Sequence, residues 1–180
     1  MTGPRPMRGY FAVGVEGISK PMNLGAILRT AHAFGASFVF TINAHHKVRD
    51  VMRADTSKTT AHVPYYDWPD LDALALPSGC ALVGVELDER AVDLPTFRHP
   101  RAAAYVLGRE KGSLTPELLE RCDHVVKIPT KFCVNVGLAA AITLYDRALN
   151  MGGWPERPLT PGGPGLDAPE AWRRPGWGGR

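Results

Sequence analysis

The sequence predicts an α/β fold in which a mostly parallel sheet is flanked by helices on both faces. Apolar runs rich in Val, Ala and Phe alternate along the chain with segments whose apolar residues recur at helical spacing. The apolar runs are continuous, which is typical of strands buried on both faces of a parallel sheet. Because ligands of such folds collect at the carboxyl ends of the strands, candidate site residues are expected there.

The first third of the chain is expected to supply two strands, two helices and a short extended piece. Strands are predicted at 10–16 and 37–42, where β-branched and aromatic residues cluster. The segment 23–36 is predicted to be a helix because its apolar residues recur three and four positions apart. A second helix is expected over 47–58, and extended chain over 62–66.

The middle of the chain repeats the alternation. A short helix is predicted at 70–76, followed by apolar strands at 80–86 and 102–108. The segment 115–122 has a typical helix start, with Thr115 as the N-cap and a proline at the first helical position.

The last elements are a strand at 124–128 and a helix at 135–149. We expect one domain over 1–150, because Gly and Pro fill 14 of the 30 positions in 151–180 and predict an irregular or disordered tail. The tryptophans and arginines of the tail could stack on and neutralise a single-stranded nucleic acid. A solvated extension whose aromatic side chains dock locally is the simpler explanation, and the sequence leaves both open.

Composition limits the class of protein. No apolar run approaches the roughly 20 residues of a transmembrane helix, and no cleavable leader is evident, so we expect a cytoplasmic protein with no membrane partner. The three cysteines are an odd number without metal-ligand spacing, which predicts a reduced protein with no metal site. The net charge of +3 permits a polyanionic partner without requiring one.

The first candidate motif lies on the helix predicted at 23–36. At 100° per residue, Arg29 lies nearly opposite the centre of the apolar stripe. Asn23 is placed to cap the helix. Gly25 leaves a bare facet for a ligand, although a glycine inside a helix costs up to about 1 kcal/mol. Taken alone, the motif also fits a solvated arginine on a surface helix.

The second motif is the turn after the strand at 102–108. Gly108 and Gly112 bracket a charged turn, and glycines there can adopt positive φ and let a ligand touch the backbone. Glu110 could accept hydrogen bonds from the ligand or the backbone. An ordinary surface connection would look similar.

The third motif follows Pro129. Thr130, Cys133 and Asn135 form a polar turn, and Asn135 is a plausible N-cap for the last helix, whose first turns carry only small side chains. A buried, alanine-rich core helix with a capping asparagine explains the same pattern. Cys133 lacks a Cys-His signature, so a small packed thiol is a better interpretation than a nucleophile.

The segment 44–62 is strongly basic. It holds only two acids, against the following positively charged or imidazole side chains: His45, His46, Lys47, Arg49, Arg53, Lys58 and His62. A surface that faces phosphates and a solvated helix face are equally good explanations.

Together, the order and separation of the three motifs are specific. They resemble the SPOUT superfamily, and within it the SpoU (TrmH-like) RNA 2′-O-ribose methyltransferases, over roughly residues 10–150. The chain departs from the family at one place. Where family members commonly carry S-x-N-x-S, it has Cys133, Asn135 and Gly137, so both hydroxyls are missing.

The resemblance implies a C-terminal trefoil knot, S-adenosylmethionine as the methyl donor, tRNA or rRNA as the substrate, and a homodimer with its active site near the subunit interface. The implied cofactor contacts are Leu107, Gly108, Glu110, Gly112, Ile128, Pro129 and Leu138. The implied catalytic set is Arg29, Asn23, Glu110 and Asn135.

The chemistry requires that the site stabilise a developing alkoxide, because a ribose hydroxyl holds its proton near neutral pH. We assign this role to Arg29, which keeps its own proton and can clamp a phosphate. Two alternatives stay open. One is a catalytically inactive RNA-binding protein of the same fold. The other is an unrelated nucleotide-binding enzyme, although neither G-x-G-x-x-G nor a Walker-type loop is present.

Overall fold

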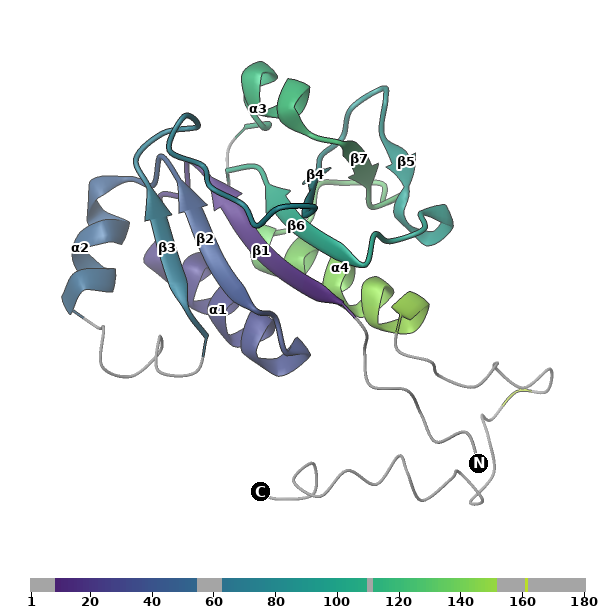
Figure 1. The fold of residues 1–180 in the computed structure, drawn as a ribbon, viewed down its shortest axis with the longest axis horizontal. Helices are drawn as coiled ribbons and strands as arrows, with labels where there is room; N and C mark the ends of the chain where they lie inside the picture. The colour runs from purple at the N-terminus through teal and green to yellow at the C-terminus, as the bar shows by residue number, and fades with distance from the viewer. Residues whose placement is uncertain (1–8, 55–62, 110–111, 152–160, 162–180) are drawn as a thin grey trace.

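The computed structural model describes residues 9–54, 63–109, 112–151 and 161 (Figure 1). Several sequence predictions therefore lie outside the described residues. They are the role of Glu110, the end of the helix expected at 47–58, and nearly all of the tail expected at 151–180. The division of the chain at residue 150 stays a prediction.

Within the described residues, seven strands form one sheet in the order β3-β2-β1-β6-β4-β7-β5. Every neighbouring pair is parallel, which confirms the predicted mostly parallel sheet. The strands are β1 (Tyr10–Glu16), β2 (Phe38–Ile42), β3 (Tyr65–Trp68), β4 (Ala81–Val85), β5 (Val92–Asp93), β6 (Ala102–Leu107) and β7 (His124–Lys127). All carboxyl ends therefore meet at one edge.

The two faces of the sheet are covered differently. The helices are α1 (Pro21–Phe34), α2 (His46–Ala54), α3 (Pro116–Arg121) and α4 (Val136–Met151), with a short 3-10 helix η1 (Leu94–Thr96). α1, α2 and α4 bury one core, and α1 lies beside α4 behind the sheet in Figure 1. The second core is covered by α3 and by the segment 69–80. Alternation along β6 serves both cores: Tyr105 faces the first, and Val106 faces the second.

The start of α1 corrects one sequence prediction. Lys20 occupies the N-cap position and Pro21 the first helical turn, so Asn23 is not the cap. Proline is favoured there because its missing N–H is one of the unpaired donors of a helix start. Asn23 instead lies inside the helix and is buried. The apolar stripe is confirmed, with Leu24 and Ile27 fully buried.

The helix predicted at 70–76 is wrong. Asp70 accepts a hydrogen bond from the Ala73 N–H at 2.9 Å, which closes a turn, and the rest of the segment crosses the sheet face without helical structure. Its leucines pack against the second core. Proline stands on either side of the segment at 69 and 77, and Pro77 disfavours helical backbone at the residue before it. The short elements β5 and η1 were not predicted.

The described ranges contain neither a membrane-spanning helix nor a cluster of metal ligands. No helix there is both long and apolar enough to cross a bilayer. Nor do three or more His, Cys, Asp or Glu side chains of those ranges come together in a group that could hold a metal ion.

Candidate functional site

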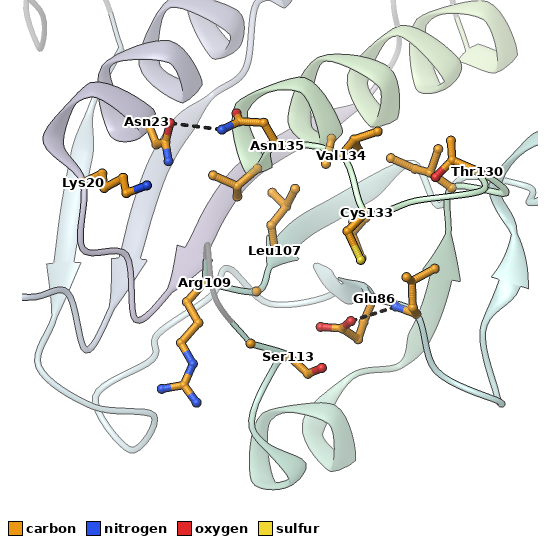
Figure 2. Close-up of a pocket in the computed structure, with 17 residues that line it drawn as sticks. Lys20, Asn23, Glu86, Leu107, Arg109, Ser113, Thr130, Cys133, Val134 and Asn135 are labelled. Carbon is orange, nitrogen blue, oxygen red and sulfur yellow. Dashed lines mark hydrogen bonds between the residues drawn. The ribbon is translucent and has the colours of Figure 1, made fainter.

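A cavity of about 440 Å³ lies at the carboxyl edge of the sheet. Three strand ends supply its walls: residues 85–87 after β4, residues 107–109 and 112–113 at and after β6, and residues from 128 to 136 after β7. The beginning of α1 contributes Lys20 and Asn23 (Figure 2). The cavity therefore stands where the open edge of a parallel sheet is expected to hold a ligand.

The lining combines apolar and polar side chains. The apolar walls are Val85, Leu87, Leu107, Ile128, Val134, Val136 and Ala139. The polar side chains are those of Lys20, Asn23, Glu86, Arg109, Ser113, Thr130, Cys133 and Asn135. Such a combination suits a ligand with a flat apolar part and several hydrogen-bonding groups.

Two carboxylates fix the segment that follows β6. β1 and β4 flank β6 in the sheet, and each is built on the same four residues, V-G-V-E, at 13–16 and 83–86. Glu16 accepts hydrogen bonds from the N–H and hydroxyl of Thr115 at 2.8 and 2.7 Å. Glu86 accepts one from the Leu114 N–H at 2.8 Å. The segment is thus held from both neighbouring strands.

Glu86 also lines the cavity itself. Its Oε1 accepts the Leu87 N–H at 2.8 Å, while Oε2 holds Leu114. A Cβ added at Gly108 would lie only 3.0 Å from Oε2 of Glu86 and 3.1 Å from the Leu114 N. The bare glycine therefore lets the chain turn closely around this carboxylate.

Asn135 links the third wall to the first helix. Its Oδ1 accepts the Gly137 N–H at 2.8 Å, which confirms the predicted cap of α4. Its Nδ2 donates to the Asn23 Oδ1 at 3.3 Å, the dashed contact at the top of Figure 2. The side chains of two separately predicted motifs therefore meet at the cavity.

The predicted cofactor contacts divide into three groups. Leu107, Gly108, Gly112 and Ile128 line the cavity. Pro129 and Leu138 are exposed and do not line it. Glu110 lies outside the described residues.

The predicted catalytic set divides in a similar way. Asn23 and Asn135 line the cavity, whereas Arg29 is exposed on α1 and does not. Arg29 follows Asn23 by six residues, so it lies about 9 Å further along the helix and about 240° around its axis.

Sequence reasoning missed three residues that shape the site. Glu86 and Lys20 line the cavity, and Glu16 fixes the segment after β6. The repeated V-G-V-E at two strand ends was the available signal for both glutamates. Cys133 is exposed and lines the cavity.

The sequence profile of the SpoU rRNA Methylase family matches residues 10–145. The chain belongs to this family. The match covers β1 through most of α4 and so includes all three cavity walls.

Curated relatives of this family are RNA-modifying enzymes. The tRNA (guanosine(18)-2′-O)-methyltransferase of Escherichia coli K12 is 30% identical over 139 residues, covering 74% of this chain and 61% of that protein. A 23S rRNA (guanosine-2′-O-)-methyltransferase of Neisseria meningitidis is 32% identical over 143 residues, covering 73% and 55%. The chain thus spans about three-fifths of the length of such relatives.

Solved structures of SpoU proteins share the fold. The methyltransferase AviRb of Streptomyces viridochromogenes superposes with a TM-score of 0.66 at 21% identity, covering 82% of this chain and 61% of that one. A structure concerning the 2-OH methylation of C/U34 on tRNA gives 0.65 at 22% identity, covering 81% of this chain and 92% of that one.

Proposed function

We propose that this SpoU protein transfers a methyl group from S-adenosylmethionine to a ribose 2′-hydroxyl of tRNA or rRNA. The observation that carries the proposal is the 440 Å³ cavity walled by the ends of β4, β6 and β7, in a chain that belongs to this family. Two relatives named above as 2′-O-methyltransferases, of tRNA and of rRNA, support both the reaction and the substrate class.

The cavity fits the methyl donor chemically. Leu107, Ile128 and Val136 offer apolar walls for a purine ring, and Glu86 offers a carboxylate toward hydroxyls or a cationic group. Gly108 and Gly112 have no side chains, so a ligand can approach the backbone on the β6 side of the cavity. When bound, S-adenosylmethionine supplies an electrophilic methyl group. Glu110, Pro129 and Leu138 remain proposed contacts.

The residues around the cavity must position the acceptor hydroxyl. Asn23 and Asn135 present amide groups at its rim and can hydrogen-bond a ribose. Arg29 keeps its proton and serves as a fixed cation that binds the neighbouring phosphate and stabilises the alkoxide. Alignment of two bound reactants contributes on the order of 7–11 kcal/mol in favourable cases.

A two-fold dimer would bring Arg29 to a cavity. Along α4, the exposed apolar side chains Leu138, Ile142, Tyr145 and Leu149 recur four, three and four residues apart and form one stripe. Met22 on the adjacent helix α1 is 77% exposed. An exposed apolar stripe of this length on a helix pair can pack against the same stripe of a second copy of the chain. In such a dimer, Arg29 of one chain would act at the cavity of the other.

Mixing two inactive variants tests this arrangement. If Arg29 and Asn135 of one site come from different chains, a refolded mixture of Arg29→Ala and Asn135→Ala regains about a quarter of the wild-type sites. A mixture that stays inactive while native mass spectrometry shows heterodimers would place both residues in one chain. Tyr145→Lys should yield a monomer when its mass is measured by light scattering.

The trefoil knot implied by the family belongs to the same proposal. The chain passes from β7 through the cavity wall at 128–135 and returns as α4 beside α1, with the long connection of 86–101 lying between β4 and β6. Threading of α4 through that connection would tie the knot. Pulling the chain by its ends in an optical trap should leave a final contour length shorter than that of an open chain.

Methyl transfer itself is tested by incubating the protein with labelled S-adenosylmethionine and bulk tRNA or rRNA, followed by nucleoside mass spectrometry. We expect one 2′-O-methylnucleoside. A methylated base would overturn the ribose assignment. Calorimetric titration with S-adenosylmethionine addresses the inactive alternative, because absence of binding with and without RNA would favour a protein that only binds RNA.

A further inference from the structure

A second cavity adjoins the first at the ends of β1 and β2. Its volume is about 660 Å³, and its lining residues are Gly17, Ser19, Lys20, Asn43, Ala44, His45, His46 and Arg109. Lys20 and Arg109 line both cavities, so they form the border between the two. A ligand that extends out of the methyl-donor cavity would enter this one across two cationic side chains.

The lining of this second cavity is suited to an anion. It contains two cationic side chains, two imidazoles, an amide and a hydroxyl, and none of its eight residues carries a carboxylate. Two acids adjoin lining residues in the sequence: Glu16 points both of its oxygens at Thr115, and Glu110 lies outside the described residues. Asp67, the acidic residue of β3, forms an ion pair with Arg49 at 3.1 Å.

The two histidines add a second kind of recognition. The rings of His45 and His46 lie 4.1 Å apart between centroids and are tilted by 38°, and both residues are exposed. Nδ1 of His45 accepts the Lys47 N–H at 3.4 Å. Imidazole rings stack on unpaired bases, and their N–H groups donate to phosphate oxygens. Asn43, with φ of 51°, turns the chain after β2 and itself lines the cavity.

We propose that the second cavity binds one nucleotide of the RNA strand next to the methylated ribose. Lys20 and Arg109 hold its phosphodiester, and the His45–His46 pair stacks on its base. This inference rests on the proposed function, because it assigns the second cavity to the same RNA. It makes an unpaired base beside the methylated ribose a contributor to substrate choice, which phosphate contacts alone do not provide.

A minimal ligand tests the site directly. Uridine 3′,5′-bisphosphate is titrated into the full chain, and the imidazole C–H signals of His45 and His46 are followed by NMR. Both should shift and saturate together, whereas uridine without phosphates should move them far less. His124, at the amino end of β7, is the internal reference. Equal shifts at His124, or none at His45 and His46, would overturn the assignment.

Variants test the site with whole RNA. His45→Ala/His46→Ala should weaken binding of bulk tRNA and of a short single-stranded oligoribonucleotide about tenfold, as expected for the loss of one stacked base. Arg109→Ala should reduce the slope of log affinity against log salt by about 0.7, the value for one phosphate contact on a single strand. Melting temperature is measured on every variant to confirm folding.

Lys47→Ala is the matched control, because Lys47 is an exposed cation beside His46 that lines neither cavity. If it weakens RNA binding as much as the histidine pair does, the effect belongs to general surface charge and the inference is wrong. Failure of the proposed function looks different. If the protein binds uridine 3′,5′-bisphosphate at His45 and His46 but methylates no RNA, the second cavity is still a nucleotide site and only the proposed methyltransferase activity is wrong.

Discussion

Asn135 donates from Nδ2 to the Oδ1 of Asn23 over 3.3 Å, across 112 positions of the chain. The same side chain caps α4 through Oδ1, which accepts the Gly137 N–H at 2.8 Å. One amide therefore fixes the start of α4 and ties it to the start of α1 at the rim of the cavity. An acceptor ribose would meet two asparagines that are already oriented by one another.

The two roles of Asn135 can be separated by substitution. Asn135→Ser keeps an acceptor for the cap but is too short to reach Asn23, whereas Asn135→Ala loses both contacts. We expect Asn135→Ala to lower the free energy of unfolding by about 1 kcal/mol and Asn135→Ser to lower it by only a few tenths. Both should reduce methyl transfer at saturating RNA. Full activity in the serine variant would limit Asn135 to capping.

The carboxylate of Glu86 predicts a specific loss of cofactor affinity. Glu86→Gln keeps one acceptor oxygen and removes the charge, so either Leu87 N–H or Leu114 N–H loses its partner. We expect the Kd for S-adenosylmethionine to rise about tenfold, since a hydrogen bond to a charged group contributes about 1.5–3 kcal/mol. Isothermal titration measures it. Glu89→Gln, an exposed carboxylate on the same loop, is the control and should bind as the wild type does.

Sequence patterns were sufficient for the main strands but not for their order or for the contacts between motifs. Continuous apolar runs predicted the main strands, because a strand that is buried on both faces needs apolar side chains at consecutive positions. The strand ends V-G-V-E at 13–16 and 83–86 show what was missed. Only the strand order, with β6 between β1 and β4, brings Glu16 and Glu86 to the same segment. No spacing in the sequence encodes that order.

Local rules also failed where tertiary structure outweighed them. Asn23 is a good capping residue, but the helix begins earlier at Pro21, and packing then buries the asparagine beside Asn135. Segment 70–76 has helix-forming residues, yet its leucines are used to cover the second core. Neither outcome follows from propensity, which is a weak preference compared with the burial of apolar surface.

The rate at which Cys133 is alkylated can report whether the cofactor occupies the cavity. Its thiol is exposed and lines the 440 Å³ cavity, while Cys80 and Cys122 are half-buried. Burial raises the pKa of the Cys122 thiol to about 11, which keeps it in the unreactive thiol form. A maleimide should therefore label Cys133 first, and saturating S-adenosylmethionine should slow that labelling several-fold. Peptide mass spectrometry gives the rate at each cysteine. An unchanged rate at Cys133 would place the cofactor elsewhere.

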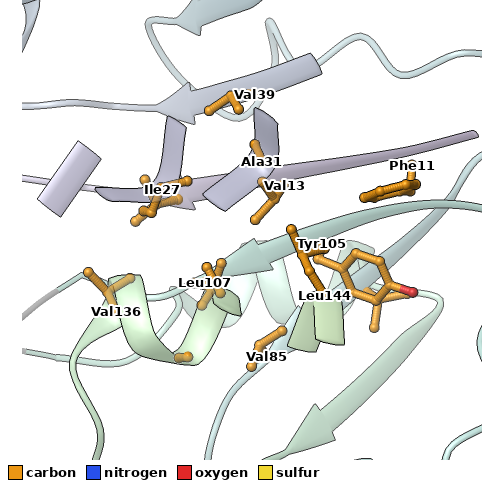
Figure 3. Packing of buried hydrophobic residues seen from close by; sticks show 14 of the residues in the cluster. Phe11, Val13, Ile27, Ala31, Val39, Val85, Tyr105, Leu107, Val136 and Leu144 are labelled. Carbon is orange, nitrogen blue, oxygen red and sulfur yellow. The ribbon is translucent and has the colours of Figure 1, made fainter. Parts of the chain in front are cut away.

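A buried polar network at the opposite end of the sheet fixes α4. The side chain of His99 is fully buried between Tyr105, whose hydroxyl lies 2.6 Å from Nδ1, and Asp146, whose Oδ2 lies 2.9 Å from Nε2. Arg147 donates to the Tyr105 hydroxyl at 3.0 Å and stacks over Phe11. Figure 3 shows Tyr105, Phe11 and Leu144 within the core that this network borders.

His99 predicts acid sensitivity of the fold. Burial lowers the pKa of His99 below its usual 6.5 despite the attraction of Asp146, so the folded protein holds a neutral ring that donates from Nε2 and accepts at Nδ1. The unfolded chain, with an ordinary histidine, binds this proton first as the pH falls. The free energy of unfolding should therefore decrease as the pH drops through about 6.5, and this contribution should level off below the folded pKa of His99.

His99→Gln isolates that contribution. Glutamine can donate to Asp146 and accept from Tyr105 but does not titrate, so the difference in unfolding free energy between wild type and variant should shrink as the pH falls from 7.5 to 5.5. Urea denaturation at several pH values measures it. A change of one pKa unit corresponds to about 1.4 kcal/mol, which is within the resolution of such curves. A difference that widens as the pH falls would mean that His99 is protonated in the folded state and that its contact with Asp146 is an ion pair, and a constant difference would mean that folding does not shift the pKa of His99.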